Sequence, residues 1–208
     1  MQKMQYEKTC SKFLLLNGIG EIKDTGTYNI FIRHGDRDKI PDGEFGNEVE
    51  LNSLGKYRSV EYGIEISNMR INTIYTSPIK RCVQTAENIV QGLGRRIPIE
   101  LTTLLGDPGA FVYDGKLAGE KYMELGFEIC YNSLLNHVPV EGNRDIAEGA
   151  ALLNDFFNRA AVKDGVNIFI SHDMIVALYA FETFGQKYTL GENWVKYLGG
   201  LILKNNGK

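Results

Sequence analysis

The sequence predicts an α/β fold, in which a mostly parallel sheet is flanked by helices on both faces in three layers. Residues 29–35, NIFIRHG, and residues 167–173, NIFISHD, share one apolar run and carry a histidine at the same position. Apolar runs rich in β-branched residues are typical of strands that are buried on both faces of a parallel sheet. Candidate strands and helices also alternate along the chain, as they do in sheets of this class.

The histidines that end these runs, His34 and His172, are two of the three in the chain. In open α/β sheets, ligands bind beyond the carboxyl ends of the strands. We therefore expect the two imidazoles to meet at a ligand-binding edge. Two unrelated core strands that end in ordinary polar residues are the alternative.

Length and composition suit one α/β domain, or one domain with an inserted lobe. The chain has 208 residues, of which 43% are hydrophobic, and a formal net charge of −3. This balanced charge argues against a nucleic-acid partner, and no segment is apolar enough to span a membrane. Three widely spaced cysteines without a CxxC pattern favour a reducing compartment, so we expect a cytoplasmic protein. The oligomeric state stays open.

The first quarter of the chain predicts an arm, a strand, a loop and a helix. Residues 1–27 are mixed and punctuated by glycine, which favours a peripheral N-terminal arm. A core strand follows at 28–33, and the polar segment 35–50 is expected to be a loop. A helix then begins with Asn52 or Ser53 as its N-cap. Its apolar positions form a rough stripe of the kind that faces a core: Leu54, Tyr57, Val60, Ile64 and Ile66.

The next segment predicts two more strands and a helix between them. The strands are expected at 71–76 and, shorter, at 97–101. Ser77 is expected to cap the helix, which has Pro78 at its first position and ends near Gly92.

Residues 105–145 have no clean period and carry many glycines and aromatic side chains. A long irregular stretch inside a compact domain is often functional. We therefore expect an inserted lid-like lobe over the site, rather than a layer of the sheet.

The last third predicts a return to alternating helices and strands. The expected elements are a helix at 145–161, a strand at 166–170, a helix at 174–184 and a final strand at 194–203. The chain thus divides into the arm at 1–27 and a single α/β domain at 28–208, with the insertion at about 105–145.

Three predicted strands end in residues that suit a phosphate group: Arg33, His34 and Arg37; Ser77 and Arg81; His172 and Asp173. The planar guanidinium group of arginine can donate two parallel hydrogen bonds to phosphate oxygens, and it stays charged at every working pH. Arg81 also lies near a predicted helix N-terminus, where anions are favoured. One obvious carboxylate among three arginines suits an oxyanion better than a divalent ion. We therefore expect a small phosphorylated substrate, with Arg37 and Ser77 among its contacts, and neither a metal nor a cofactor.

This set of residues resembles the signature of the histidine phosphatase superfamily, which includes phosphoglycerate mutases and histidine acid phosphatases. The matching segments follow the family's order and span residues 28 to 173. In the second of them, asparagine replaces the family's threonine. They are Arg33-His34-Gly35, Leu51-Asn52-Ser53-Leu54-Gly55, Ser77-Pro78-Ile79-Lys80-Arg81 with Gln84-Thr85-Ala86-Glu87, and Ser171-His172-Asp173.

The resemblance implies a phosphatase that works through a phosphohistidine. His34 would be the nucleophile, and Arg33, Arg81 and His172 would hold the phosphoryl oxygens. A neutral imidazole is an available nucleophile at pH 7 without a separate base. Water would then release phosphate.

The general acid has two candidates, because the signature is mixed. Asp173 and Arg37 are similar to the acid-phosphatase branch, whereas the short chain is nearer the mutase-like members. Those members take their acid from the region after the third strand, which here holds Asp107. We take Asp173 as the first choice and Asp107 as the second. A helix cap near Met174 is the alternative role of Asp173.

Two other classes of phosphate-handling protein have motifs that this sequence lacks. It lacks the G-x-x-x-x-G-K-[ST] motif of P-loop kinases and GTPases, and no cysteine is followed six residues later by arginine, as in thiolate phosphatases. A metal-dependent hydrolase with His34, His172 and Asp173 as ligands stays open. A mutase and a non-catalytic phospholigand-binding module also stay open, and the substrate itself cannot be read.

Overall fold

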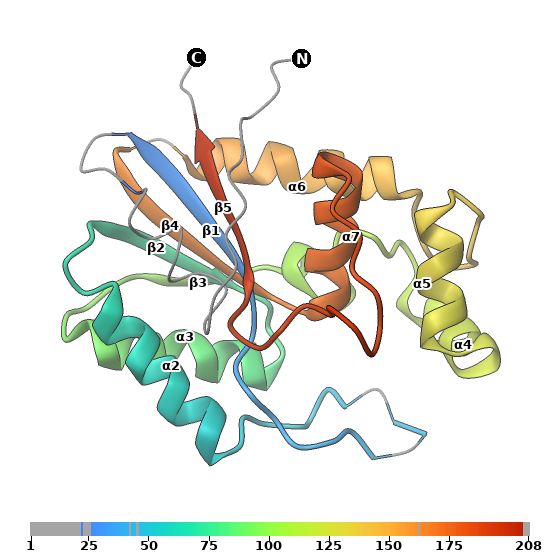
Figure 1. Cartoon of the computed structure of the whole chain (residues 1–208), viewed down its shortest axis with the longest axis horizontal. Coiled ribbons are helices and arrows are strands. Elements are labelled where there is room, and N and C mark those ends of the chain that lie inside the picture. Colours follow the sequence, from blue (N-terminus) through green and yellow to red (C-terminus); the bar gives the residue numbers. More distant parts are fainter. Residues whose placement is uncertain (1–21, 23–25, 42, 45, 162, 206–208) are drawn as a thin grey trace.

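A five-stranded sheet forms the centre of the computed structural model, which describes residues 22, 26–41, 43–44, 46–161 and 163–205. The predicted arm at 1–27 lies almost entirely outside these residues. The strand order is β3–β2–β4–β1–β5 (Figure 1). Four strands are parallel, and β5 pairs with β1 in the antiparallel direction. Their bounds are β1 Thr27–Arg33, β2 Ile71–Thr76, β3 Ile99–Leu101, β4 Gly165–Ser171 and β5 Gly200–Asn205.

The two similar apolar runs form neighbouring strands. Equivalent residues pair across β1 and β4: Asn29 with Asn167, Ile30 with Ile168, and Phe31 with Phe169. Inside the sheet, Asn167 Nδ2 donates a hydrogen bond to Asn29 Oδ1 at 3.3 Å. Because the strands are parallel and in register, His34 and His172 emerge side by side at one edge, as predicted.

Helices cover both faces of the sheet, which confirms the predicted α/β layers. Helices α2 (Ser53–Glu65) and α3 (Lys80–Leu93) pack on the face that carries Ile30 and Ile168. Helices α6 (Ile146–Ala160) and α7 (Asp173–Phe184) pack on the face that carries Phe31 and Phe169. Successive strand side chains point to opposite faces, so each run supplies both cores. None of the described helices is long and apolar enough to cross a membrane.

Helices α2 and α3 approach each other through glycines. A Cβ on Gly63 would lie 2.1 Å from Ile89 O, and a Cβ on Gly92 would lie 2.0 Å from Val60 O. The apolar stripe predicted for α2 is only partly present: Leu54, Tyr57 and Ile64 are exposed, whereas Val60 is half-buried and Ile66 is buried. The face of α2 that packs against α3 is built mostly from small residues, so it does not show up in the sequence as an apolar stripe. The buried residues of α2 are Gly55, Ser59, Tyr62 and Gly63.

Two predicted boundaries differ from the structure. Helix α3 begins at Lys80 rather than at Ser77-Pro78, and its N-cap position is Ile79. The last strand begins at Gly200 rather than at Trp194, because the preceding residues form a loop at the end of β1. Gly200 lies so close to β1 that a Cβ would be 1.9 Å from Phe31 O.

Residues 105–145 hold two helices that were not predicted, α4 (Gly115–Leu125) and α5 (Phe127–Leu135), after the short 3₁₀ turn η1 (Thr103–Leu105). Asp114 caps α4 by accepting hydrogen bonds from the backbone N–H groups of Lys116 and Leu117. The glycines and aromatic residues scattered through this segment interrupt the spacing of apolar residues that would predict a helix. Figure 1 shows both helices beside α7 and away from the strands.

Candidate active site

His34 follows β1 and is buried, with 2% of its surface exposed. Its Nδ1 lies 2.8 Å from Gly35 O. A carbonyl oxygen only accepts, so Nδ1 carries the proton and Nε2 keeps a lone pair in the neutral ring. Burial, with the charges of His172, Arg81 and Arg33, lowers the pKa of His34 well below its ordinary value. The imidazole is therefore neutral at pH 7.

Arg81, in the first turn of α3, joins the two histidines. Its Nε donates a hydrogen bond to His34 Nε2 at 3.0 Å, and its Nη2 lies 3.2 Å from His172 Nδ1. Its Nη1 donates to Gly46 O at 2.6 Å. A guanidinium carries only donors, so an arriving oxyanion can take over any of these N–H groups.

His172 follows β4 and is oriented from both ring nitrogens. Nδ1 accepts from Arg81, so Nε2 carries the proton and lies 3.1 Å from Ser77 Oγ. The ring centroid lies 5.5 Å from that of His34. Burial and the charge of Arg81 lower the pKa of His172. The edge of the sheet thus holds two neutral imidazoles beside cationic guanidinium groups.

Arg33, the last residue of β1, forms an ion pair with Asp173 at the start of α7. The distance from Arg33 Nη2 to Asp173 Oδ2 is 2.9 Å, and Trp194 Nε1 donates to the same oxygen at 3.1 Å. Arg33 Nη1 donates to Val195 O at 2.6 Å, and the guanidinium lies 4.0 Å from the centre of the Tyr197 ring. Burial raises the pKa of Asp173, but the Arg33 charge and the Trp194 hydrogen bond outweigh it. The net pKa lies below the usual value.

Asp173 plays the alternative role of a helix cap only in part. His172 occupies the N-cap position of α7, and Asp173 is the first helical residue. Asp173 Oδ1 accepts a hydrogen bond from Met174 N at 2.9 Å. The carboxylate thus contacts both the helix end and Arg33.

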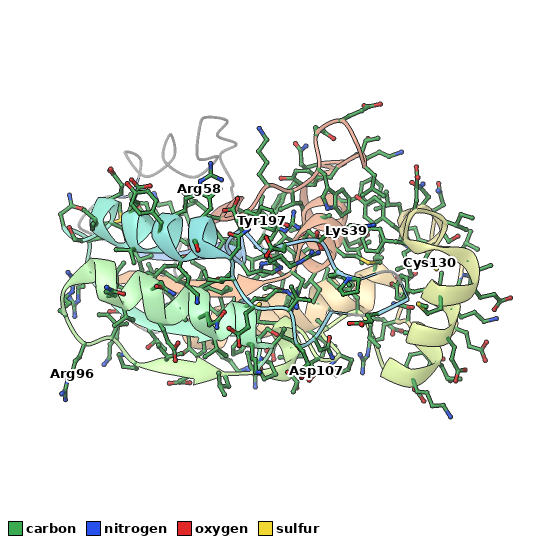
Figure 2. The ribbon with its side chains drawn as sticks, turned by 90° about the horizontal axis from the view of Figure 1, so that it is seen from below. Lys39, Arg58, Arg96, Asp107, Cys130 and Tyr197 are labelled. Atoms are coloured by element: carbon green, nitrogen blue, oxygen red, sulfur yellow. The ribbon has the colours of Figure 1, made fainter. Side chains whose placement is uncertain are left out.

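A cleft of about 550 Å³ opens beside these residues. Asp107 lines it, between the α2–α3 half and the α4–α5 half of the molecule (Figure 2). The preceding Gly106 is so close to His172 that a Cβ would lie 2.5 Å from its ring. The remaining cleft wall is largely apolar and comes from α4, α5, α7 and adjoining loops: Phe111, Val112, Tyr122, Met123, Phe127, Met174, Ile175, Leu178, Leu190 and Trp194.

The structure brings the predicted site residues together. Six of the eight line the cleft: His34, Arg37, Arg81, Asp107, His172 and Asp173. The other two lie behind it, where Arg33 contacts Asp173 and Ser77 contacts His172. Their side chains come from the ends of β1, β2 and β4 and from the loops and helices that follow.

Several contacts at the site were not predicted. Thr85 Oγ1 accepts from Gly35 N at 3.0 Å and donates to Arg81 O at 2.6 Å. The Gln84-Thr85 pair in the third motif was the available signal for this link. The contacts of Gly46 and Val195 run through backbone carbonyls, which side-chain patterns do not reveal.

The guanidinium groups beside the two histidines favour an oxyanion at that end of the cleft. Arg37 and Arg81 supply guanidinium groups, and both imidazoles are neutral, so the wall near His34 is cationic. Within the described part of the chain, no group of three or more His, Cys, Asp and Glu side chains is arranged to hold a metal ion.

Comparisons with known sequences agree with this geometry. Residues 29–124 match the family model described as histidine phosphatase superfamily (branch 1). The ecdysteroid-phosphate phosphatase of Bombyx mori is 26% identical over 177 residues, which cover 74% of this chain and 26% of that protein. The chain thus spans about a quarter of the length of this curated relative.

Solved structures share the fold. A phosphoserine phosphatase mutant from Entamoeba histolytica, in complex with phosphoserine, matches with a TM-score of 0.54 and 21% identity, over 86% of this chain and 97% of that one. A phosphoglycerate mutase from Bacillus anthracis matches with a TM-score of 0.55 and 14% identity, over 86% and 92% of the two chains. These likenesses confirm the predicted α/β architecture.

Proposed function

Because the chain belongs, through residues 29–124, to the histidine phosphatase superfamily, we propose that it hydrolyses a phosphomonoester through a phosphohistidine on His34. One observation carries this proposal. Nδ1 of His34 is tied to Gly35 O, so Nε2 presents its lone pair beside Arg81. A nucleophile needs that lone pair, and the lowered pKa of His34 keeps it available at pH 7.

The proposed reaction has two steps. In the first, His34 Nε2 attacks phosphorus, the bond from phosphorus to the leaving oxygen breaks, and a general acid protonates that oxygen. In the second, water attacks the phosphohistidine, and the same carboxylate takes the proton of the water. Phosphate then leaves and Nε2 is restored.

Phosphoryl transfer depends mainly on positioning and on stabilising charge. In this proposal, Arg81, Arg37 and His172 contact the phosphoryl oxygens, and Arg33 adds its positive charge from behind the cleft, where it is paired with Asp173. His172 Nε2–H donates a hydrogen bond to Ser77 Oγ, which fixes the orientation of that ring. The neutral His172 then acts as a hydrogen-bond partner rather than as a second cation.

We propose Asp107 as the general acid and Asp173 as a positioning residue, which reverses the sequence-based preference. A general acid must be protonated, and the ion pair with Arg33 favours the ionised form of Asp173. Asp107 lines the same cleft, and the preceding Gly106 packs closely against the His172 ring. Asp107 forms no ion pair with another described residue.

The proposal also covers metal dependence, domain organisation, compartment and substrate size. We propose that catalysis needs no metal, that residues 28–208 form one domain with an insertion at 105–145, and that the compartment is the cytoplasm. The two described cysteines, Cys82 and Cys130, are free, which suits a reducing compartment. The Bombyx mori relative is named an ecdysteroid-phosphate phosphatase, and the similar Entamoeba histolytica structure is in complex with phosphoserine. We propose a small phosphorylated substrate here too.

A phosphate-release screen tests the function. Sugar phosphates, nucleotides, phosphopeptides and inositol phosphates would be compared with the wild-type chain, a His34→Ala variant and a His137→Ala control. His137 is exposed and lies outside the cleft. We expect phosphate release by the wild type and the control only; release by His34→Ala at the wild-type rate would overturn the proposal.

A further inference from the structure

The cleft continues well beyond the phosphate end, and its far wall is apolar. We propose that the leaving group of the substrate is an apolar, ring-bearing alcohol that binds against this wall. The inference rests on the proposed phosphatase function and names the substrate class of the same site.

Direct contacts join the apolar wall to the site. Trp194 donates to Asp173, and its ring packs edge-on against Phe127 with centroids 5.7 Å apart. The Phe127 ring lies 6.3 Å from that of Tyr122, whose OH contacts Met174 Sδ at 3.5 Å. Met174 directly follows Asp173 in α7. The apolar wall is therefore connected to Asp173 through Trp194 and Met174.

Part of this wall is exposed in the described structure, although its side chains are large and apolar. Phe127 is 38% exposed and Met123 is 54% exposed. Apolar side chains that line a concave site gain free energy when a ligand removes them from water. Scattered exposed apolar residues need no explanation, but these two lie in one cleft with Trp194 and Tyr122.

The charges in the cleft argue against an anionic leaving group. Among the described residues that line it, the cations are Arg37 and Arg81, both near the histidines. The other charged groups are the carboxylates of Glu44, Asp107 and Asp173. No described cation lies along the apolar wall to pair with a second carboxylate or phosphate. Glycerate-like and amino-acid leaving groups would meet carboxylates and apolar surface instead.

The volume of the cleft suits this ligand. Its 550 Å³ falls within the range of about 300–1,000 Å³ that drug-sized ligands occupy. A phosphate alone would leave most of that space to water, whereas a fused-ring alcohol would fill the apolar half.

The test compares three esters of primary alcohols, so that leaving-group acidity changes little: 2-(2-naphthyl)ethyl phosphate, glycerol 3-phosphate and 3-phosphoglycerate. We expect kcat/KM for the naphthylethyl ester to exceed the other two by about 10-fold or more. An equal or higher value for 3-phosphoglycerate would overturn the inference and leave the proposed function standing. Phosphate release from none of the three would also overturn the inference, whereas the proposed function is tested separately by the phosphate-release screen with His34→Ala.

Variants on one helix locate the binding surface. We expect Phe127→Ala to lower kcat/KM for the naphthylethyl ester by about 5–10-fold and to leave glycerol 3-phosphate within about 2-fold. Ile129→Ala is the matched control, since Ile129 is exposed on the same helix and lies outside the cleft. Met123→Ala repeats the test from α4. An equal loss for both esters in Phe127→Ala and Met123→Ala, or no loss in either, would overturn the assignment.

Discussion

Arg81 Nε donates a hydrogen bond to His34 Nε2 at 3.0 Å, and the same guanidinium reaches His172 Nδ1 through Nη2. The lone pair of the proposed nucleophile therefore points at the cation that would neutralise a phosphoryl group. A phosphorus atom that approaches Nε2 meets this guanidinium first.

Replacement of Arg81 tests whether its guanidinium group binds the phosphoryl group. We expect Arg81→Lys to lower kcat/KM by about 10²–10³-fold, because lysine keeps the charge but cannot contact two oxygens and His34 together. Arg96→Lys is the control, since Arg96 is exposed at the far end of the molecule (Figure 2). Steady-state kinetics with nitrophenyl phosphate provide the measurement. A variant with the wild-type kcat/KM would show that Arg81 does not contact the reacting group.

The general acid is assigned by leaving-group dependence. An alkyl alcohol needs a proton as it leaves, and nitrophenolate hardly does; general acid help is commonly worth about 10²–10⁴-fold. We expect Asp107→Asn to slow alkyl phosphates far more than nitrophenyl phosphate. Asp173→Asn should slow both substrates to a similar extent, because it releases Arg33. The reverse pattern would make Asp173 the acid.

Metal dependence separates the proposed mechanism from a metal-dependent hydrolase. We expect full activity after dialysis against EDTA, and inhibition by vanadate, which resembles the five-coordinate phosphoryl group. The cationic wall of the cleft suits such an oxyanion. Activity that EDTA abolishes and Mg²⁺ or Mn²⁺ restores would refute the metal-free proposal.

Stability should fall as the pH drops below about 6.5, the ordinary pKa of histidine. His34 and His172 have lowered pKa values in the folded chain. Below their ordinary value the unfolded chain therefore binds more protons, and the free energy of unfolding rises with pH. Each such histidine contributes a slope of up to about 1.4 kcal/mol per pH unit.

Urea unfolding at pH 7, 6 and 5 measures this slope. We expect His34→Asn and His172→Asn each to make it shallower. His137→Asn is the control: its hydrogen bond with Asp145 raises the pKa of His137, so the stability it adds is complete below the ordinary value and is lost above it. An unchanged slope in both buried-site variants would contradict the lowered pKa values.

The central strands and the cluster at their ends could be predicted from the sequence, because parallel strands bring sequence-distant residues to one edge. The NIFI runs have a strong signal, since apolar residues on both faces permit few other structures. His34, Arg81 and His172 each follow or adjoin such a strand. Their proximity follows from topology alone.

The buried face of α2 and the ion pair of Arg33 with Asp173 could not be predicted from the sequence. The inner face of α2 is built on Gly55, Ser59 and Gly63, whose burial serves close backbone contact rather than apolar area. The ion pair of Arg33 with Asp173 depends on a loop before β5 that carries strand-like residues such as Trp194. The roles of the two aspartates are set by that tertiary contact, which the motif alone does not specify.

Covalent labelling tests the central claim most directly. The wild-type chain would be mixed with a ³²P-labelled phosphomonoester, quenched within milliseconds in base, digested and mapped by mass spectrometry. We predict a base-stable, acid-labile phosphohistidine on His34, absent from His34→Ala and present in His137→Ala. Labelling of any other residue, or full turnover by His34→Ala, would contradict the account.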